Sequence, residues 1–181
     1  RPLEGLTSAN PLSYLSTAAQ IHYNWWSYRI FRVLTNHTLF PGVTALVLCA
    51  MAFRARAVGI PAARRMLVAI GLIGFIMSLG TSTPVYRWAY EIIPPLGGIR
   101  NTARFGFLVI LAVAGLAGFG LAALRQRWPT RWMTMISLGA FATAGLEAVH
   151  APMPYVPYTG IPAIYQPIAA DPEPVAVLEL P

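Results

Sequence analysis

Two arginines four residues apart, Arg100 and Arg104, have the type and spacing that most directly suggest chemistry in this chain. They lie in the run Pro94–Phe105, which immediately precedes a long apolar stretch. If a helix begins near Asn101, its first N–H groups face the same end as the two guanidinium groups. Helix N-termini and arginines both bind anions, phosphate above all. The pattern predicts a clamp for a lipid-linked phosphate; the alternative is a pair of arginines that extend to lipid headgroups.

Three nearby residues have supporting roles in this hypothesis. Asn101 is expected to cap the helix that follows, with direct contact to a substrate as the alternative. Arg87 and Glu91 are four residues apart in the preceding segment, which is the spacing of a helical ion pair. The alternative is that Glu91 and Arg87 face the substrate.

A second acidic residue, Glu147, lies near the end of the fourth apolar stretch, close to His150. Ionisable groups within membranes are often functional. Two ligands are too few for a metal site, so a structural or interfacial role is favoured over a proton relay. His22 and His37 are expected to be interfacial residues in aromatic surroundings. No metal site or cofactor is predicted here, although the full-length protein could hold a divalent metal.

The composition indicates the environment of these residues. Hydrophobic residues make up 56% of the chain and charged residues only 10%, whereas soluble domains are roughly 25% charged. A chain with so little charge is expected to lie in a bilayer. The net charge of +7 does not indicate nucleic acid binding, because the arginines flank apolar stretches and so form a topology pattern.

Four apolar stretches predict an all-α integral membrane protein, because backbone polar groups in lipid must be satisfied within helices. Arginine-rich loops after the first and third spans are expected to be cytoplasmic, which places both ends of the chain outside. The residues between the second and third spans then form an outer loop that carries the arginine pair. The predicted spans are residues 39–53, 66–82, 105–124 and 132–149, and the outer loop is 83–104.

The remaining segments are expected outside the membrane. Residues 1–38 are rich in Trp and Tyr, which favours a helix at the membrane interface. A second interfacial helix is expected over 84–93, because Pro84 suits a first helical position and Pro94-Pro95 ends the helix. Residues 151–181 contain many prolines and are expected to lead into a truncated soluble domain outside the membrane. The chain is therefore interpreted as a piece of a longer multi-pass protein.

Small residues on two of the spans predict close helix packing, since they let membrane helices approach each other. The expected contact stripes are Gly71, Gly74 and Ser78 on the second span, and Ala114, Gly118 and Ala122 on the third.

Several motifs resemble a group of poorly characterised bacterial multi-pass proteins, similar to YfhO-like proteins and to membrane glycosyltransferases of the GT-C superfamily. In that group the outer loop typically reads P-P-L-x-x-x-R-x-P-x-R-F before a span that ends L-A-G-x-G-L. This chain departs from the pattern at Thr102, where proline is more usual. The matching runs are Leu79–Arg87, Pro94–Leu96, Ile99–Phe105 and Leu116–Leu121, with Leu39–Gly42 and Val177–Pro181 at the two ends.

This resemblance implies sugar transfer from a polyprenyl-phosphate-linked donor at the outer face of a bacterial inner membrane. Arg100 and Arg104 would bind the donor phosphate, and the catalytic acid would lie in a first outer loop that this chain does not contain. The expected partners are membrane lipids and the lipid-linked sugar, without nucleic acid, and the oligomeric state is left open. The alternative is a non-enzymatic transporter or structural envelope protein that handles lipid-linked glycans.

Overall fold

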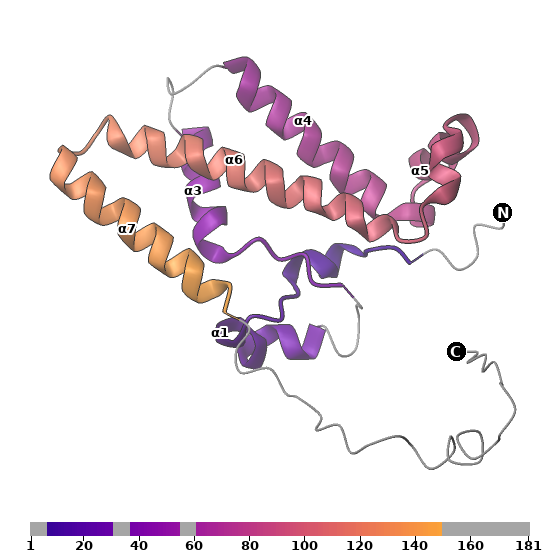
Figure 1. The fold of residues 1–181 in the computed structure, drawn as a ribbon, viewed down its shortest axis with the longest axis horizontal. Helices are drawn as coiled ribbons and strands as arrows, with labels where there is room; N and C mark the ends of the chain where they lie inside the picture. The colour runs from indigo at the N-terminus through magenta and orange to yellow at the C-terminus, as the bar shows by residue number, and fades with distance from the viewer. Residues whose placement is uncertain (1–6, 31–36, 55–60, 150–181) are drawn as a thin grey trace, which may run out of the picture. The chain divides into compact units, whose positions relative to one another are not determined.

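The structure is a computed structural model that describes residues 7–30, 37–54 and 61–149. Helices and short helical turns make up most of it (Figure 1). All of these lie in the first of the chain's two units, Arg1–Ala151. The prediction of a truncated outer domain in residues 151–181 falls outside the described residues, and so does His150.

Apart from an isolated parallel bridge between Thr7 and Asn101, the described residues form no β structure, so the all-α prediction is confirmed for them. The main helices are α1 (Gln20–His22), α3 (Val43–Arg54), α4 (Pro61–Ser78), α5 (Pro84–Ile92), α6 (Gly106–Arg125) and α7 (Thr130–Glu147). Short 3-10 turns span Pro11–Leu15, Gly80–Ser82, Pro94–Gly98 and Thr102–Phe105, and a π-helical turn spans Tyr23–Ser27.

Four of these helices coincide with the four predicted spans, but they differ in their capacity to cross a bilayer. Among the described residues, only the segment Thr102–Arg125 is both long and apolar enough to do so. Helix α3 is apolar but has only 12 residues, fewer than the roughly 20 that a hydrocarbon core requires. The prediction of four crossings is therefore not confirmed, and the prediction of a membrane protein rests on α6.

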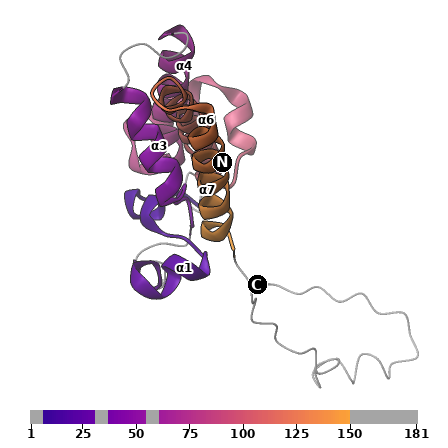
Figure 2. The same cartoon turned by 90° about the vertical axis from the view of Figure 1, so that its left-hand side faces the viewer.

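Helices α3 and α4 both pack against α6, and small residues make the contacts close (Figures 1 and 2). A Cβ atom added at Gly71 would lie 3.0 Å from the Cβ of Ala112, and one at Gly74 would lie 2.7 Å from the Cβ of Leu108. Ser78, one turn further along α4, is fully buried. The predicted contact stripe on the second span is confirmed.

The predicted stripe on the third span is wrong. Ala114, Gly118 and Ala122 are exposed, and a Cβ atom at Gly118 would meet no atom within 4 Å. The buried face of α6 carries Gly120 instead, where a Cβ atom would run into the carbonyl group of Leu48 on α3. Because α6 has small residues on several faces, spacing alone could not show which of them meets a neighbouring helix.

Outside the long helices, the π-helical turn holds the first aromatic segment together. The Tyr28 N–H donates to the Tyr23 carbonyl across this turn. Trp26 Nε1 donates to the Leu15 carbonyl at 2.8 Å, which ties the turn to the segment before α1. Figure 2 shows α1 beneath the lower ends of α3 and α7, and the Gln20 N–H there donates to the Val149 carbonyl at 3.0 Å.

Replacement of Gly120 by alanine is expected to destabilise the protein. The new methyl group would meet backbone atoms of Leu48, and overpacking of this kind costs about 1–3 kcal/mol. The matched control is Gly118→Ala, which adds the same group into open space and should leave stability unchanged or raise it by up to about 1 kcal/mol. Thermal unfolding in detergent, followed by circular dichroism, measures both; equal losses would show that α3 does not cross α6 at Gly120.

Candidate functional site

The loop that carries Arg100 is held in place by an N-terminal segment that runs beside it. The Thr7 N–H donates to the Arg100 carbonyl at 3.1 Å, and the Thr102 N–H donates to the Thr7 carbonyl at 2.9 Å. Two residues on, the Ala9 N–H donates to the Ser78 carbonyl at 3.0 Å, at the end of α4. Backbone hydrogen bonds therefore connect the loop, the N-terminal segment and α4.

Thr102 is the centre of this connection. Its side chain is fully buried, and its Oγ1 lies 3.2 Å from the Thr7 carbonyl oxygen and 3.4 Å from that of Ser78. Gly80 lies against it with a φ of +54°, and a Cβ atom there would come within 2.6 Å of Thr102 Oγ1. A proline at position 102 could make none of these bonds, because it has neither an N–H nor a hydroxyl group. Thr102 therefore holds this loop through bonds that a proline at the same position would lack.

Asn101 caps the next turn, as predicted. Its side chain accepts a hydrogen bond from the Ala103 N–H at 3.1 Å, at the start of the 3-10 turn Thr102–Phe105. This turn continues directly into α6. The two arginines therefore flank the N-terminal end of the most apolar helix that the structure describes.

An open pocket of about 610 Å³ brings Arg100, Asn101 and Arg104 together. Both arginines are exposed, and their guanidinium groups form no hydrogen bond or ion pair with any other described residue. The apolar wall includes Phe107, whose side chain is 63% exposed. The residues that line the pocket are Gly98, Ile99, Arg100, Asn101, Arg104, Phe105, Phe107 and Leu108.

Arg87 and Glu91 lie on α5, whose bounds nearly match the 84–93 predicted for the interfacial helix. Neither residue lines this pocket. The predicted ion pair between them is wrong. Arg87 Nε instead donates to the Thr81 carbonyl at 2.9 Å, because α5 follows the turn Gly80–Ser82 so closely that the side chain reaches back to it. Glu91 is left exposed.

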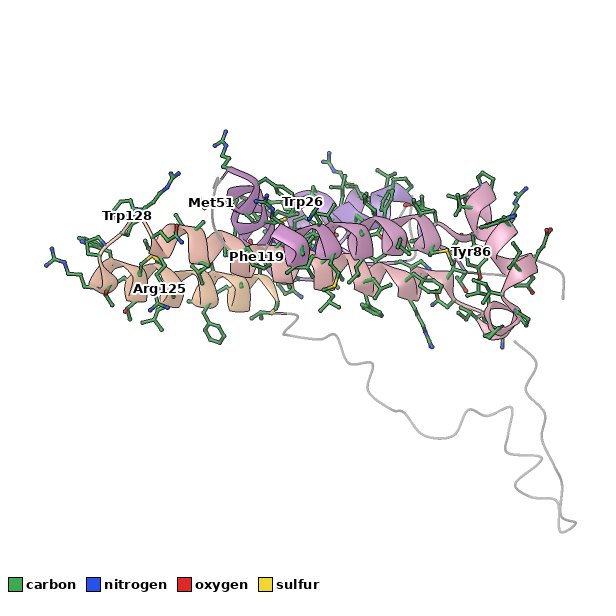
Figure 3. All side chains as sticks on the ribbon, turned by 90° about the horizontal axis from the view of Figure 1, so that it is seen from above. Trp26, Met51, Tyr86, Phe119, Arg125 and Trp128 are labelled. Carbon is green, nitrogen blue, oxygen red and sulfur yellow. The ribbon has the colours of Figure 1, made fainter. Side chains whose placement is uncertain are left out.

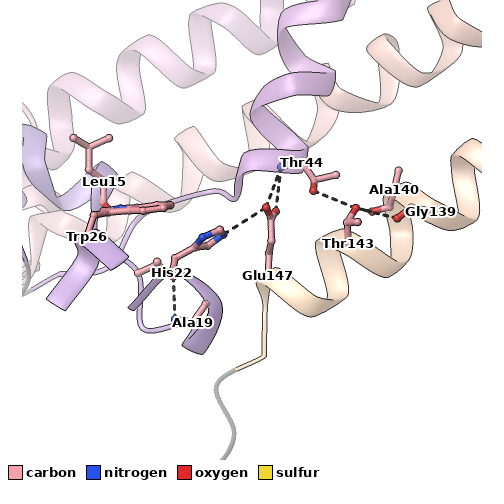
Figure 4. A network of polar contacts seen from close by, with 10 residues as sticks. Leu15, Ala19, His22, Trp26, Thr44, Gly139, Ala140, Thr143 and Glu147 are labelled. Atoms are coloured by element: carbon pink, nitrogen blue, oxygen red, sulfur yellow. Dashed lines mark hydrogen bonds and ion pairs between the residues drawn. The ribbon is translucent and has the colours of Figure 1, made fainter. Parts of the chain in front are cut away.

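A second polar cluster forms around Glu147, at the end of α7 (Figure 4). Its carboxylate accepts the Thr44 N–H in the first turn of α3, with Thr44 N 3.1 Å from Oε2 and 3.4 Å from Oε1. Gly42 makes room for this carboxylate: its φ is +96°, and a Cβ atom there would lie 2.8 Å from Glu147 Oε2. Glu147 thus accepts a hydrogen bond from an otherwise unpaired N–H group at the start of another helix, where a negative charge is favourable.

His22 is the residue that faces Glu147, and sequence reasoning did not find this pair. His22 Nε2 lies 3.5 Å from Glu147 Oε1, and both side chains are largely buried. The imidazole ring packs against Trp26, with ring centroids 4.7 Å apart, and against Phe40 at 5.6 Å. The aromatic surroundings predicted for His22 are confirmed, but His22 does not stand alone.

Figure 3 shows which of the labelled side chains lie toward each end of α6. Arg125 and Trp128 lie at one end of α6, whereas Tyr86, on α5, lies near the other. Tyr86 is completely buried, and burial raises the pKa of its phenol, with the neighbouring Tyr90 acting in the same direction. Tyr86 is therefore a buried side chain of α5 that stays in its neutral form to higher pH than a phenol in water.

Replacement of Thr102 by proline is expected to loosen the arginine loop. The substitution removes the two hydrogen bonds that Thr102 donates to the Thr7 carbonyl, and each hydrogen bond contributes about 0.5–1.5 kcal/mol. Thr102→Val is the matched variant: it keeps the N–H and the branched shape and should lose less. Unfolding in detergent compares them; a proline variant as stable as the original chain would mean that the Thr7 pairing contributes nothing.

Comparison with protein-family models, with curated proteins and with solved structures finds no match to this chain. The resemblance to YfhO-like proteins and GT-C glycosyltransferases therefore stays a prediction based on the motifs quoted above.

Proposed function

We propose that this chain is the membrane part of a glycosyltransferase-like protein that binds a polyprenyl-phosphate-linked sugar at the outer face of the bacterial inner membrane. The observation that carries the proposal is the pocket at the start of α6, where two exposed arginines that pair with no described residue meet an apolar wall. Such a pocket combines the two chemical features of the proposed ligand, an anionic head and a hydrocarbon chain.

The electrostatics of the pocket favour phosphate. Guanidinium groups form bidentate hydrogen bonds with phosphate oxygens, and Arg100 and Arg104 have all of their donors available for this. The N-terminal end of a helix adds a partial positive charge at the same place. Asn101 uses its side-chain oxygen for the cap, and its side-chain NH2 group remains as a donor at the pocket.

The position of the pocket supports a lipid as the ligand. In the apolar part of the segment Thr102–Arg125, only 22% of the residues are buried, whereas the core helix of a water-soluble protein is covered on most sides. Phe107 and Leu111 are exposed one turn apart on α6, beyond the arginines. An isoprenoid chain bound with its phosphate at the arginines would find apolar side chains along this helix.

In a transferase, the two arginines would stabilise the lipid phosphate as it leaves the sugar. A base would still have to activate the acceptor hydroxyl. The described lining of the pocket contains no carboxylate, so in a transferase this base would come from another part of the protein. The second candidate is a non-enzymatic protein that binds or carries a lipid-linked glycan. Both candidates require the same phosphate pocket.

The double variant Arg100→Ala with Arg104→Ala is expected to weaken binding of polyprenyl phosphate at least about tenfold, which corresponds to roughly 1.4 kcal/mol. The reason is the loss of both guanidinium partners of the phosphate. Binding is measured by titration of the purified chain in detergent.

Two controls separate this effect from a general loss of charge. The variant Arg125→Ala with Arg131→Ala removes the same charge from exposed positions near the other end of α6 and should bind as the original chain does. The uncharged polyprenol should bind equally to all three proteins. Unchanged binding of polyprenyl phosphate by the Arg100 and Arg104 variant would exclude the proposed clamp.

The predicted orientation is tested by cysteine labelling. Gly98→Cys, in a background where the native Cys49 is replaced by serine, places a thiol where the structure leaves open space. A membrane-impermeant maleimide should label it in intact cells, because the proposal puts the pocket outside. Arg127→Cys at the opposite end of α6 should react only after permeabilisation. The reverse pattern would place the arginine pocket in the cytoplasm.

A further inference from the structure

A second cavity, of about 240 Å³, lies beside Glu147 and shares no lining residue with the arginine pocket. It is smaller than the roughly 300 Å³ or more of a pocket for a drug-sized ligand. Polar and apolar groups share its wall, which is formed by Ser16, Thr17, Ala18, Thr38, Phe40, Pro41, Gly42, Ala144, Glu147 and Ala148.

Ser16 is the informative residue of this cavity. It is fully buried, and its hydroxyl has no hydrogen-bond partner among the described residues. Buried hydroxyl groups in folded proteins nearly always have a partner, because a missing one costs free energy. Ser27 shows the ordinary case: it is equally buried, donates to the Thr17 carbonyl and accepts the Thr17 N–H at 2.7 Å. No described residue is a partner for the Ser16 hydroxyl, and a ligand in the cavity would provide one.

Glu147 provides a second polar group in the same wall, and contacts within the protein already fix the position of its carboxylate. The Thr44 N–H donates to its carboxylate, His22 Nε2 lies 3.5 Å from it, and Gly42 leaves the space in which it lies. A carboxylate has about four lone-pair sites, so it can accept a further hydrogen bond from a donor in the cavity.

We propose that this cavity binds a neutral polyhydroxyl compound of monosaccharide size. One ligand hydroxyl donates to Glu147, a second exchanges a hydrogen bond with Ser16 Oγ, and the ring of Phe40 packs against the carbon skeleton. A cationic ligand is less suitable, because the charge of Glu147 already faces His22 and the N-terminus of α3. This proposal does not rest on the lipid-phosphate pocket.

Binding is tested on the full chain in detergent by saturation-transfer-difference NMR, with D-glucose, D-galactose and D-mannose as probes. At least one hexose should bind saturably. Ser16→Ala should weaken this binding by about threefold or more, because one neutral hydrogen bond is lost, and Glu147→Gln by about tenfold, because a charged acceptor is lost. Thr134→Ala, which changes an exposed hydroxyl on α7, should leave binding unchanged.

Stability measurements separate a binding defect from unfolding. Because the Ser16 hydroxyl bonds to no described residue, Ser16→Ala should be as stable as the original chain or more stable. Ser27→Ala removes a hydroxyl that bonds twice within the fold and should lower the unfolding temperature. A stable Ser16→Ala variant with weakened hexose binding supports the proposal.

Three results would overturn it. The first is the absence of saturable binding by all three hexoses, which would leave the cavity to water. The second is hexose binding that neither Ser16→Ala nor Glu147→Gln weakens, because the sugar would then lie elsewhere. The third is displacement of the bound hexose by ethylammonium at lower concentrations than by a second hexose, which would identify a cation site.

Discussion

The backbone pairing between Thr7 and the residues on either side of Asn101 is the interaction on which the arginine pocket depends. It joins the N-terminal segment to the start of α6, while Thr102 Oγ1 and the Ala9 N–H join both to the end of α4. Without these bonds, Arg100 would lie in a loop between α5 and α6 whose backbone has no hydrogen bonds to other segments. With them, the backbone around Arg100 is held by hydrogen bonds as in a helix, so less conformational entropy would be lost when a ligand binds to the two guanidinium groups.

Much of this arrangement could be predicted from the sequence, because it depends on local chemistry. The apolar stretches predict four helices, and their bounds lie within a few residues of α3, α4, α6 and α7. Asn101 as a cap and Pro84 at the start of α5 follow from backbone preferences that hold in any fold. The two arginines share a pocket, as expected from their closeness in the sequence, although Arg100 lies before the turn Thr102–Phe105 and only Arg104 lies within it.

What could not be predicted depends on contacts between distant segments. Nothing near Glu147 in the sequence indicates His22 as its neighbour. The histidine that lies close to Glu147 in the sequence is His150. The best available signal was Gly42, directly before an apolar helix, but a glycine there does not show what fills the space beside it. Arg87 similarly bonds to Thr81 rather than to Glu91, because a backbone carbonyl that the turn brings close is invisible to helical spacing.

The two cavities differ in the way their charges are balanced. The arginines of the first are exposed and pair with none of the residues that the structure describes, so their charge is available to a ligand. The carboxylate of the second already accepts a hydrogen bond from the start of a helix, whose partial positive charge reduces its attraction for other cations. The first is therefore suited to an anion, and the second to a ligand recognised by its shape and hydroxyl groups.

The π-helical turn Tyr23–Ser27 restricts how the length of this chain can vary. Each residue of a helix turns the chain by about 100°, so removal of one residue from this turn would rotate His22 relative to Ser27. The histidine must face Glu147 while the serine bonds to Thr17, and Trp26 between them must reach Leu15. Single-residue deletions here should consequently be rarer among natural variants than substitutions, since a shortened turn cannot satisfy all three contacts at once.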